Sequence, residues 1–388
     1  MKIIYILNST YLYGGATKSF LHLIAKHKEK GVEALVVCPN KNGVFKYLVD
    51  RGVYCKCLRY MPIWLPKRKS KIGYFVNILR YTKRVSINTV ATIKLCFICK
   101  KNHPDIIHTN TSVNDIGYKA SKICRIPHIW HIREYGDLDF GQTIPYLERR
   151  LCAPNNYSIA ITKDVARHRK VLNRDSNRII YNGIIDTAVI PTMNIDKEPF
   201  FLFAGRCTKG KGFNDLVKAY INYCQSEKAP LMLKVTGNKE DTDNTKEQWE
   251  LLKSVHLENN VEWIGLRKDI ESYMAKALAI IIPSKYEGFG RVMAESMFYG
   301  CLVIGHNTGG TKEQFDNGYE LSGEEIGLRY NTEETLIKHL KDITKQGISP
   351  YVLMMNRAQR TALRLYTSEV YADKIISFYK DILNISEQ

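Results

Sequence analysis

Short apolar runs alternate along the chain with longer stretches in which apolar residues recur every three or four positions. Parallel strands joined by amphipathic helices give this alternation in α/β proteins. The expected strands of the first half are KIIYILN, EALVVCP, IIHTN, HIWHI, YSIAIT and RIIYN. Those of the second half are PFFLFAG, LMLKVTG, VEWIG, AIIIPS and LVIGH. The repeated pattern predicts two similar doubly wound α/β domains.

A polar, proline-bearing stretch separates the halves at residues 186–199, DTAVIPTMNIDKEP, and it has no hydrophobic period. We interpret it as the linker, with an N-terminal domain over residues 1–190 and a second domain from residue 191. Ligands of open α/β sheets bind beyond the carboxyl ends of the strands. Two such domains facing each other would enclose a central cleft lined by those ends. From residue 351 onward the spacing predicts helix.

Length and composition indicate a globular protein that needs more than one core. The chain has 388 residues, with 45% hydrophobic and 25% charged residues. No stretch offers the roughly 20 apolar residues of a spanning helix, and polar Asn8 and Ser9 follow the first apolar run too early for a cleaved signal peptide. Cys96 and Cys99 form a CxxC without a second pair, which favours buried reduced thiols over zinc. We therefore predict a cytoplasmic protein.

Positive charge is concentrated in one part of the chain. The net charge is +18, and residues 51–104 contain thirteen Lys and Arg but no Asp or Glu. From Trp64 to Arg84, basic residues are interleaved with aromatic and aliphatic ones at helical spacing. This composition suits an anionic membrane surface, while nucleic acid or a solvated basic face are the alternatives. We favour peripheral contact with the inner face of the cell membrane, and no nucleic acid, because no nucleic-acid-binding module is visible.

Two glycine-bearing turns between a strand and a helix are candidate phosphate sites. Gly14 and Gly15 follow the first strand, where backbone N–H groups at a helix start favour an anion, although such glycines also serve turn geometry alone. No GxGxxG fingerprint is present. The second domain opens with FLFAGRCTKGKG, which contains Arg206 and Lys211. Two fixed cations there would stabilise a diphosphate leaving group without a metal; the alternative is a solvated basic loop.

The stretch SKYEGFGRVMAESMFYG, residues 284–300, holds two glutamates after a buried apolar run. Gly288 and Gly290 predict a tight turn at a helix N-terminus, which favours anions. Glu287 precedes the turn, and Glu295 falls about one turn into the helix. Carboxylates accept hydrogen bonds from the paired hydroxyls of ribose and hexoses, so we interpret the glutamates as sugar ligands. A helix cap and a surface ion pair are the structural alternative.

His131 ends the apolar run HIWHI. There its imidazole would face the cleft and could bond a sugar hydroxyl or support deprotonation of an acceptor, although a lone histidine can equally be structural. Two DxD spacings occur in polar loop sequence at residues 137–139 and 241–243. Because Arg206 and Lys211 already serve the phosphates, we expect no essential metal and no cofactor.

Taken together and in this order, these segments resemble the retaining GT-B glycosyltransferases of family four, also called glycosyl transferases group one. The most specific segments are EGFGRVMAE and GCLVIGHNTGGTKE, and GRCTKGKG, YNGIID and HIRE support them over nearly the whole chain. The resemblance implies the GT-B architecture: two doubly wound Rossmann-like domains facing a central cleft. It also implies that a C-terminal helix, residues 367–388, returns to the first domain. Residues 1–190 would then bind the acceptor and residues 191–366 the nucleotide-sugar donor.

The resemblance further implies roles for single residues. The matches to Arg206 and Lys211 hold the diphosphate, the match to Glu295 holds the ribose, and the match to Glu287 contacts the donor sugar. Retention is expected on one face, with the departing phosphate assisting the incoming hydroxyl, so Glu287 is not a nucleophile. The implied catalytic set is His131, Glu287, Arg206 and Lys211.

Backbone amides and a loop complete the implied donor site. The amides belong to Gly15, Gly288, Phe289, Gly290 and Arg291. The base rests against residues 265–267, which include Arg267. Arg291 departs from the aliphatic or small residue usual in the family, and Leu302 from the usual proline; the first departure bears on donor preference.

The sequence therefore predicts an enzyme that moves a hexose or N-acetylhexosamine from a UDP- or GDP-sugar to a glycan or lipid-linked acceptor in surface polysaccharide synthesis. An epimerase would need no acceptor, and a phosphorylase usually carries a cofactor lysine; no separate motif supports either. A non-catalytic scaffold that binds nucleotide or glycan in an assembly complex is the alternative from a different class. Degenerate relatives typically lose Glu287, Glu295 or Lys211, and all three are present here.

Overall fold

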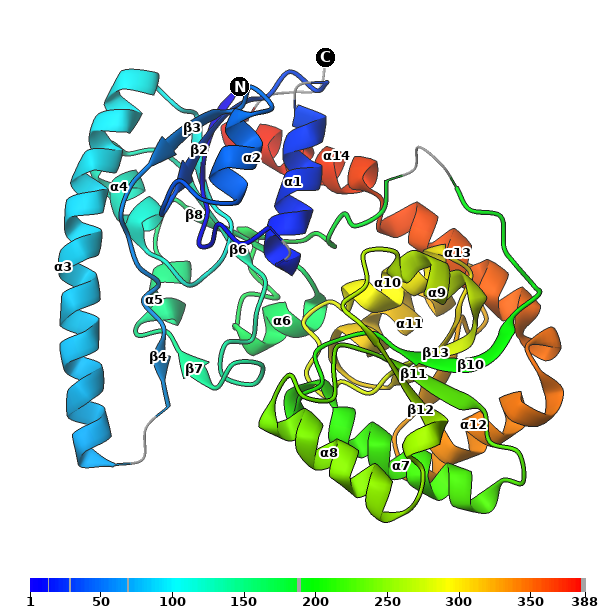
Figure 1. Ribbon diagram of the computed structural model, residues 1–388. Coiled ribbons are helices and arrows are strands. Elements are labelled where there is room, and N and C mark those ends of the chain that lie inside the picture. The colour runs from blue at the N-terminus through cyan, green and yellow to red at the C-terminus, as the bar shows by residue number, and fades with distance from the viewer. Residues whose placement is uncertain (13, 28, 68–69, 187–189, 385–388) are drawn as a thin grey trace. The chain divides into compact units, whose positions relative to one another are not determined.

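The structure is a computed structural model that describes residues 1–12, 14–27, 29–67, 70–186 and 190–384. The chain forms two compact units (Figure 1). Unit 1 comprises Met1–Ile184 and Ser368–Gln388, and unit 2 comprises Ile185–Thr367. Of the stretch interpreted as the linker, residues 187–189 lie outside the described residues.

Unit 1 is built on a seven-stranded parallel sheet in the order β3-β2-β1-β5-β6-β8-β9. Its strands are β1 (Lys2–Ile6), β2 (Glu33–Cys38), β3 (Tyr54–Cys57), β5 (Ile106–Thr109), β6 (His128–Ile132), β8 (Asn156–Ala160) and β9 (Asn177–Ile179). From β1 the chain winds outward to β3 and then, from β5, in the opposite direction. This reversal between β1 and β5 makes the sheet doubly wound and creates a topological switch point.

Helices cover both faces of this sheet, which explains its apolar strands. One core cluster joins the sheet to α1 (Gly15–His27), α2 (Val44–Val49) and α14 (Ser368–Leu383). Another joins it to α3 (Lys71–Asn102) and α4 (Ile116–Cys124). Two short helices, α5 (Leu147–Leu151) and α6 (Lys163–His168), complete the unit. A small antiparallel pair, β4 (Leu65–Pro66) and β7 (Gln142–Thr143), lies beside the N-terminal end of α3 (Figure 1).

The predicted return of the C-terminal helix to the first domain is confirmed. Helix α14 packs against α1, and Tyr371, Ile375 and Tyr379 belong to the core cluster of the first half. On the surface, Lys30 forms ion pairs with Glu369 and Asp373. Helix α14 is therefore part of the fold of unit 1.

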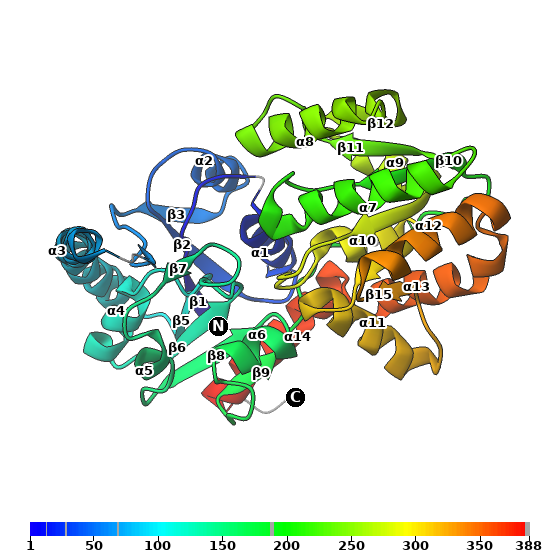
Figure 2. The same cartoon turned by 90° about the horizontal axis from the view of Figure 1, so that it is seen from below.

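Helix α3 is 32 residues long and is buried along only part of its length. Ser70 caps its N-terminus by accepting a hydrogen bond from the amide of Gly73, and the helix ends at left-handed His103 before Pro104. All its buried residues lie between Asn88 and Cys99. Both views place α3 on the outer side of unit 1 beside α4 (Figures 1 and 2). Among the described helices, α3 included, none is both long and apolar enough to cross a membrane.

Unit 2 repeats the doubly wound plan with a six-stranded parallel sheet in the order β12-β11-β10-β13-β14-β15. Its strands are β10 (Glu198–Phe203), β11 (Met232–Thr236), β12 (Val261–Gly265), β13 (Ala277–Ile282), β14 (Leu302–His306) and β15 (Leu328–Tyr330). Here the winding reverses between β10 and β13. The switch point of unit 2 therefore lies between the carboxyl ends of these two strands.

A core cluster of unit 2 includes Phe201, Phe213, Tyr220 and Leu340. The sheet is flanked by helices. They are α7 (Phe213–Ser226), α8 (Asp243–Ser254), α9 (Ile270–Lys276), α10 (Arg291–Phe298), α11 (Gly309–Ser322), α12 (Glu333–Gln346) and α13 (Val352–Leu365). Figure 1 shows α7 and α8 below β10 and β11 and α10 above them.

The predicted strands are all found, six in unit 1 and five in unit 2. The sequence missed β3, β15 and the β4–β7 pair. These are edge or two-residue strands, in which few side chains face a core, so that the apolar signal is weak. The α/β fold class predicted from the sequence is confirmed.

Candidate functional site

Two sequence-predicted loops meet at the switch point of unit 2. The loop after β10 carries Arg206 and Lys211, and the turn after β13 carries Glu287. Because β10 and β13 are neighbouring parallel strands, both loops leave the same edge of the sheet. This edge, at a point where the winding reverses, is where ligands of open α/β sheets bind.

Lys211 and Glu287 are in direct contact across this point. The Lys211 Nζ atom lies 2.7 Å from Glu287 Oε2, and their side chains are 27% and 18% exposed. Both side chains are thus largely buried but retain some contact with solvent. The two residues are 76 positions apart in the sequence, and the fold places an ammonium and a carboxylate side by side.

A tight backbone approach holds the Arg206–Lys211 loop against the end of β13. Gly212 has φ +71°, and a Cβ atom at this position would lie 2.0 Å from the carbonyl oxygen of Pro283. The preceding residues form a 3-10 turn, Lys209–Lys211, that leads into α7. Arg206 is exposed, and its guanidinium forms no ion pair within the described part of the chain. The loop therefore presents one paired and one unpaired cation.

Helix α11 locks the glycine turn in place. The amide of Gly310 donates to the Glu287 carbonyl oxygen at 2.7 Å, and Gln314 donates to the carbonyl oxygens of Phe289 and Gly290. A Cβ atom on Gly310 would lie 2.6–2.8 Å from the backbone of Phe289. The Phe289 ring is buried edge-on against Tyr366, with centroids 5.2 Å apart. Phe289 thus anchors the turn.

The second glutamate is held by the arginine that departs from the family pattern. Arg291 Nη2 donates to Glu295 Oε1 at 3.1 Å, an (i, i+4) pair on α10 with side chains 17% and 24% exposed. The Arg291 side chain is therefore engaged with the residue expected to bind ribose. Sequence reasoning did not foresee this contact.

The loop after β12 offers a feature that sequence reasoning missed. Arg267 is turned back onto Asp269 in a bidentate pair at 2.9 and 2.8 Å, which raises the pKa of its guanidinium. The neighbouring Leu266 is 92% exposed, an unusual position for leucine in a folded loop. Thr236 and Gly237 link this loop to the one after β10, since the Gly205 amide donates to Thr236 Oγ1 and Gly237 pairs with the residue before Leu266.

His131 lies in the interior of unit 1. Strand β6 continues to Ile132, and all five of its side chains are buried because helices cover both faces of the sheet. His131 Nδ1 lies 3.1 Å from His108 Nε2 and 3.3 Å from Arg133 Nη2. Burial, followed by the charge of Arg133, holds the pKa of His131 well below its usual value. His131 is therefore a neutral, internally bonded imidazole.

Arg133 and Glu134 are buried beside His131. The Arg133 guanidinium donates to Asn110, Asn182 and Tyr371, whose oxygens are all uncharged. Glu134 accepts from both the amide and the hydroxyl of Ser112, at 3.0 and 2.6 Å, and burial raises its pKa. These contacts indicate that the segment HIRE, residues 131–134, connects the end of β6 to neighbouring segments of unit 1.

The remaining predicted positions are structural or belong to unit 1. Gly15 is exposed at the first residue of α1 in unit 1, whereas the other donor-site candidates belong to unit 2. Asp137 bonds His168 and Asp139 accepts from an amide of its own loop. No group of three or more His, Cys, Asp or Glu that could hold a metal occurs in the part of the chain that the structure describes.

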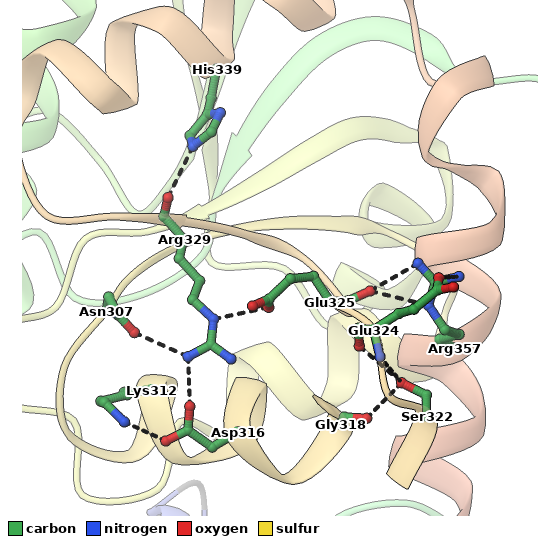
Figure 3. Close-up of polar contacts among 10 residues, drawn as sticks. All are labelled: Asn307, Lys312, Asp316, Gly318, Ser322, Glu324, Glu325, Arg329, His339 and Arg357. Carbon is green, nitrogen blue, oxygen red and sulfur yellow. Dashed lines mark hydrogen bonds and ion pairs between the residues drawn. The ribbon is translucent and has the colours of Figure 1, made fainter. Parts of the chain in front are cut away.

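A further polar cluster in unit 2 surrounds Arg329 (Figure 3). Its guanidinium donates to Asp316 and Asn307 and to Glu325, so that β15 is tied to α11. Arg357 on α13 donates to the Glu325 carbonyl oxygen. A surface pocket of about 470 Å³ borders Arg329, Asp316 and Glu325. Every charged group drawn has a partner within the cluster, which indicates a structural role.

Comparison with known protein families matches both halves of the chain. A family model described as "Glycosyl transferases group 1" matches residues 189–359. One described as "Glycosyltransferase Family 4" matches residues 13–187. The two matches lie side by side and together cover most of the chain.

Individual relatives agree with these matches. A protein described as an uncharacterized glycosyltransferase, MJ1607 of Methanocaldococcus jannaschii, is 23% identical over 302 residues, which are 71% of this chain and 75% of that protein. The N-acetylgalactosamine-N,N'-diacetylbacillosaminyl-diphospho-undecaprenol 4-alpha-N-acetylgalactosaminyltransferase of Campylobacter jejuni is 30% identical over 148 residues, 37% of either chain. Among solved structures, Anabaena Alr3699/HepE in complex with UDP has a TM-score of 0.77 at 20% identity, covering 98% of this chain and 100% of that one.

Proposed function

The chain belongs to the family 4, group 1 glycosyltransferases of the GT-B fold, and on this premise we propose that it is a retaining, metal-independent hexosyl- or N-acetylhexosaminyltransferase. Its donor would be a UDP- or GDP-sugar and its acceptor a glycan or lipid-linked glycan of surface polysaccharide synthesis. It would work in the cytoplasm, at the inner face of the membrane.

The contact between Lys211 and Glu287 is the observation that carries this proposal. It joins, at the switch point of unit 2, a cation suited to phosphate and a carboxylate suited to sugar hydroxyls. A nucleotide sugar carries both chemical groups next to each other, because the sugar is bonded to the terminal phosphate. The phosphate of such a ligand would bind the ammonium of Lys211, and its sugar hydroxyls would bind the carboxylate of Glu287.

The proposed reaction breaks the bond between the anomeric carbon and the terminal phosphate oxygen and forms a bond from that carbon to the acceptor oxygen. Negative charge increases on the leaving phosphate as the bond breaks, so Lys211 and Arg206 stabilise the transition state more than the ground state. The acceptor proton passes to the leaving phosphate oxygen on the same face. Glu287 orients the donor sugar and forms no covalent intermediate.

Nucleotide recognition is proposed for two neighbouring loops of unit 2. Glu295, oriented by Arg291, would accept from the ribose hydroxyls. The exposed Leu266 would pack against the face of the base, whose burial would offset the unfavourable exposure of this side chain. That the Anabaena structures contain UDP and UDP-glucose supports a uracil nucleotide as the first ligand to test.

Calorimetric titration with UDP, GDP, ADP and dTDP, each with and without EDTA, tests the donor site. We expect one nucleotide to bind, EDTA to have no effect, and Arg206→Ala and Glu295→Ala to abolish measurable binding. If no nucleotide binds, or if binding survives both substitutions, the glutamates are structural. The function as a non-catalytic scaffold then replaces the proposed enzymatic function. Nucleotide binding that is lost in EDTA would contradict the metal independence of the mechanism and no other part of the proposal.

Leu266→Ser is expected to lower the affinity for the selected nucleotide about fivefold, because about 1 kcal/mol of apolar burial against the base is lost. Leu353→Ser is the matched control, since Leu353 is also exposed in unit 2 but lies on α13. Titration calorimetry of both variants measures the difference. If the two variants bind the nucleotide with equal affinity, Leu266 does not contact the base.

Helix α3 supports the proposed contact with the membrane. Six of its exposed apolar side chains fall on one narrow stripe at 100° per residue, opposite the buried face: Ile72, Phe75, Leu79, Val90, Ile93 and Phe97. Exposed Lys83 and Lys94 border the stripe. The stripe extends beyond Arg84, where the sequence-predicted stretch ends; residues 68–69 of that stretch lie outside the described residues.

Charge favours a lipid surface over a second copy of the chain as the occupant of this stripe. Residues 51–104 contain no acidic side chain, so two α3 helices packed together would bring like charges into contact. An anionic bilayer instead accepts the apolar side chains and attracts the lysines. The undecaprenol-linked acceptor in the name of the Campylobacter relative is consistent with a substrate held in a membrane.

Replacing Lys83 and Lys94 with serine is expected to weaken binding to phosphatidylglycerol-containing vesicles about 30-fold at low salt, at about 1 kcal/mol for each lysine. The control replaces Lys246 and Lys253, which are exposed on α8, and changes the charge equally. Vesicle co-sedimentation measures both. An equal loss in the control, or a wild-type protein that ignores the vesicles, would contradict the proposed surface, as would a dimer in solution that Phe75→Ser dissociates.

A further inference from the structure

A small apolar surface lies on the loop that follows β6 in unit 1. Carboxylates and apolar side chains alternate over residues 137–140, and the apolar ones face outward: Leu138 and Phe140 are 39% and 45% exposed. Both carboxylates, Asp137 and Asp139, form hydrogen bonds within unit 1, at 2.7 and 3.0 Å. The loop therefore keeps its charges bonded to the protein and presents apolar side chains to solvent, the reverse of an ordinary surface loop.

Hydrogen bonds and a ring contact fix the shape of this loop. The amide of Gln142 donates to the Gly136 carbonyl oxygen at 2.9 Å, which ties the two ends of the loop together. Strand β7 then pairs with β4. The Phe140 ring packs on Trp64, the residue before β4, with centroids 5.9 Å apart. Trp64, Leu138 and Phe140 thus form one preformed apolar surface, called the loop patch below.

The apolar stripe of α3 points away from the loop patch. Asn77 on α3 donates to the Pro66 carbonyl oxygen at 2.8 Å. Arg84, also on α3, donates to the Trp64 carbonyl oxygen, so this side of the helix faces the β4–β7 pair. Phe75 of the stripe is about 200° around the helix from Asn77, at 100° per residue. A bilayer lying on the stripe is therefore on the opposite side of α3 from the loop patch.

The place of the patch in the chain indicates what kind of ligand covers it. The loop follows the carboxyl end of β6, the edge of a parallel sheet where ligands bind. Leu138 is six residues beyond Ile132, the last residue of β6, so their Cα atoms are at most about 22 Å apart. A molecule with a polar end at the strand ends and an apolar end on the patch fits both features. A glycan acceptor carried on a lipid has this chemistry.

A cation adjoins the loop patch. The Lys67 amide donates to the carbonyl oxygen of Gly141, next to Phe140, at 3.2 Å. The Lys67 side chain is 57% exposed and lies 3.5 Å from Asp137, an ion pair too exposed to contribute much. Its ammonium can therefore pair with the phosphate of a lipid carrier without losing a strong partner. Residues 51–104 contain no acidic side chain that would repel this phosphate.

We propose that the loop patch binds the hydrocarbon chain of a phosphate-bearing lipid acceptor, beside Lys67. Of the two acceptor classes in the proposed function, this site selects the lipid-linked one. The inference rests on the proposed function for the sugar that is transferred, whereas binding of the lipid can be measured without it.

Titration calorimetry of the full chain with farnesyl phosphate, below the concentration at which it forms micelles, tests the site without a bilayer. We expect farnesyl phosphate to bind at least tenfold more tightly than inorganic phosphate, because only the former has a chain for the patch. Phe140→Ser is expected to lower the affinity for farnesyl phosphate about tenfold. Ile123→Ser is the control, since Ile123 is also exposed in unit 1 but lies on α4.

Phosphatidylglycerol vesicles separate this site from the membrane surface of α3. We expect Phe140→Ser to bind vesicles like the wild type, and Phe75→Ser to bind them more weakly while its affinity for farnesyl phosphate is unchanged. The inference is overturned by a wild-type protein that binds farnesyl phosphate no better than inorganic phosphate, or by equal affinities of Phe140→Ser and Ile123→Ser. Loss of vesicle binding in Phe140→Ser, or a dimer in solution that this substitution dissociates, would also overturn it. A wild-type protein that binds no nucleotide contradicts the proposed function and leaves the lipid site to the farnesyl phosphate result.

Discussion

Lys211→Ala is expected to reduce the rate of sugar transfer about 10²- to 10³-fold, the loss typical when one fixed group that stabilises developing charge is removed. The affinity for the intact nucleotide sugar should fall much less, because the charge on the leaving phosphate oxygen develops only as its bond to the sugar breaks. The substitution also leaves the Glu287 carboxylate, 18% exposed, without its 2.7 Å partner. The measurement is release of nucleoside diphosphate from the nucleotide sugar that calorimetry selects.

Lys209→Ala provides the matched control for this result. Lys209 lies in the same 3-10 turn, is exposed, and forms no ion pair within the described ranges of the chain. The Lys209→Ala variant tests whether sugar transfer depends on the overall positive charge of the loop or on Lys211 itself. If both variants lose activity equally, or if Lys211→Ala retains activity within about fivefold of the wild type, Lys211 does not have the role proposed from its geometry.

Gly212→Ala is expected to destabilise unit 2 by about 3 kcal/mol or more and to abolish nucleotide binding. A left-handed φ of +71° costs an alanine about 1–2 kcal/mol. The added Cβ atom would also lie 2.0 Å from the Pro283 carbonyl oxygen, a backbone atom that can retreat only if the loop separates from β13. That separation would pull Lys211 away from Glu287. Urea unfolding, with hydrogen exchange to locate the change in unit 2, measures the effect.

Gly210→Ala is the control within the same loop. A Cβ atom on Gly210 would meet no atom within 4 Å, and its backbone lacks the positive φ. We expect its stability to stay within about 0.5 kcal/mol of the wild type. Unfolding of Gly212→Ala at the same urea concentration as Gly210→Ala would contradict the contact between the loop and β13.

The regular elements of this protein could be predicted from its sequence because their signals are local. The run AIIIPS is apolar at every position of a strand buried on both faces, and the glycines of EGFG mark the turn that follows it. Edge strands β3 and β15 were missed because half of their side chains face solvent or because they are only three residues long. The (i, i+4) contact of Arg291 with Glu295 was within reach of the sequence, since helical spacing alone places the pair together.

The contacts that define the candidate site depend on which strands are neighbours. The sequence by itself determined two α/β halves, the linker region and the residue types at the strand ends, since hydrophobic period and turn chemistry act over a few residues. Only the tertiary structure decided that Lys211 meets Glu287 and that His131 is buried against His108. Only it decided that Tyr379, 271 residues after His108, completes their chain of hydrogen bonds. Sheet order and the return of a terminal helix are set by packing of the whole core, and no local stretch of sequence encodes them.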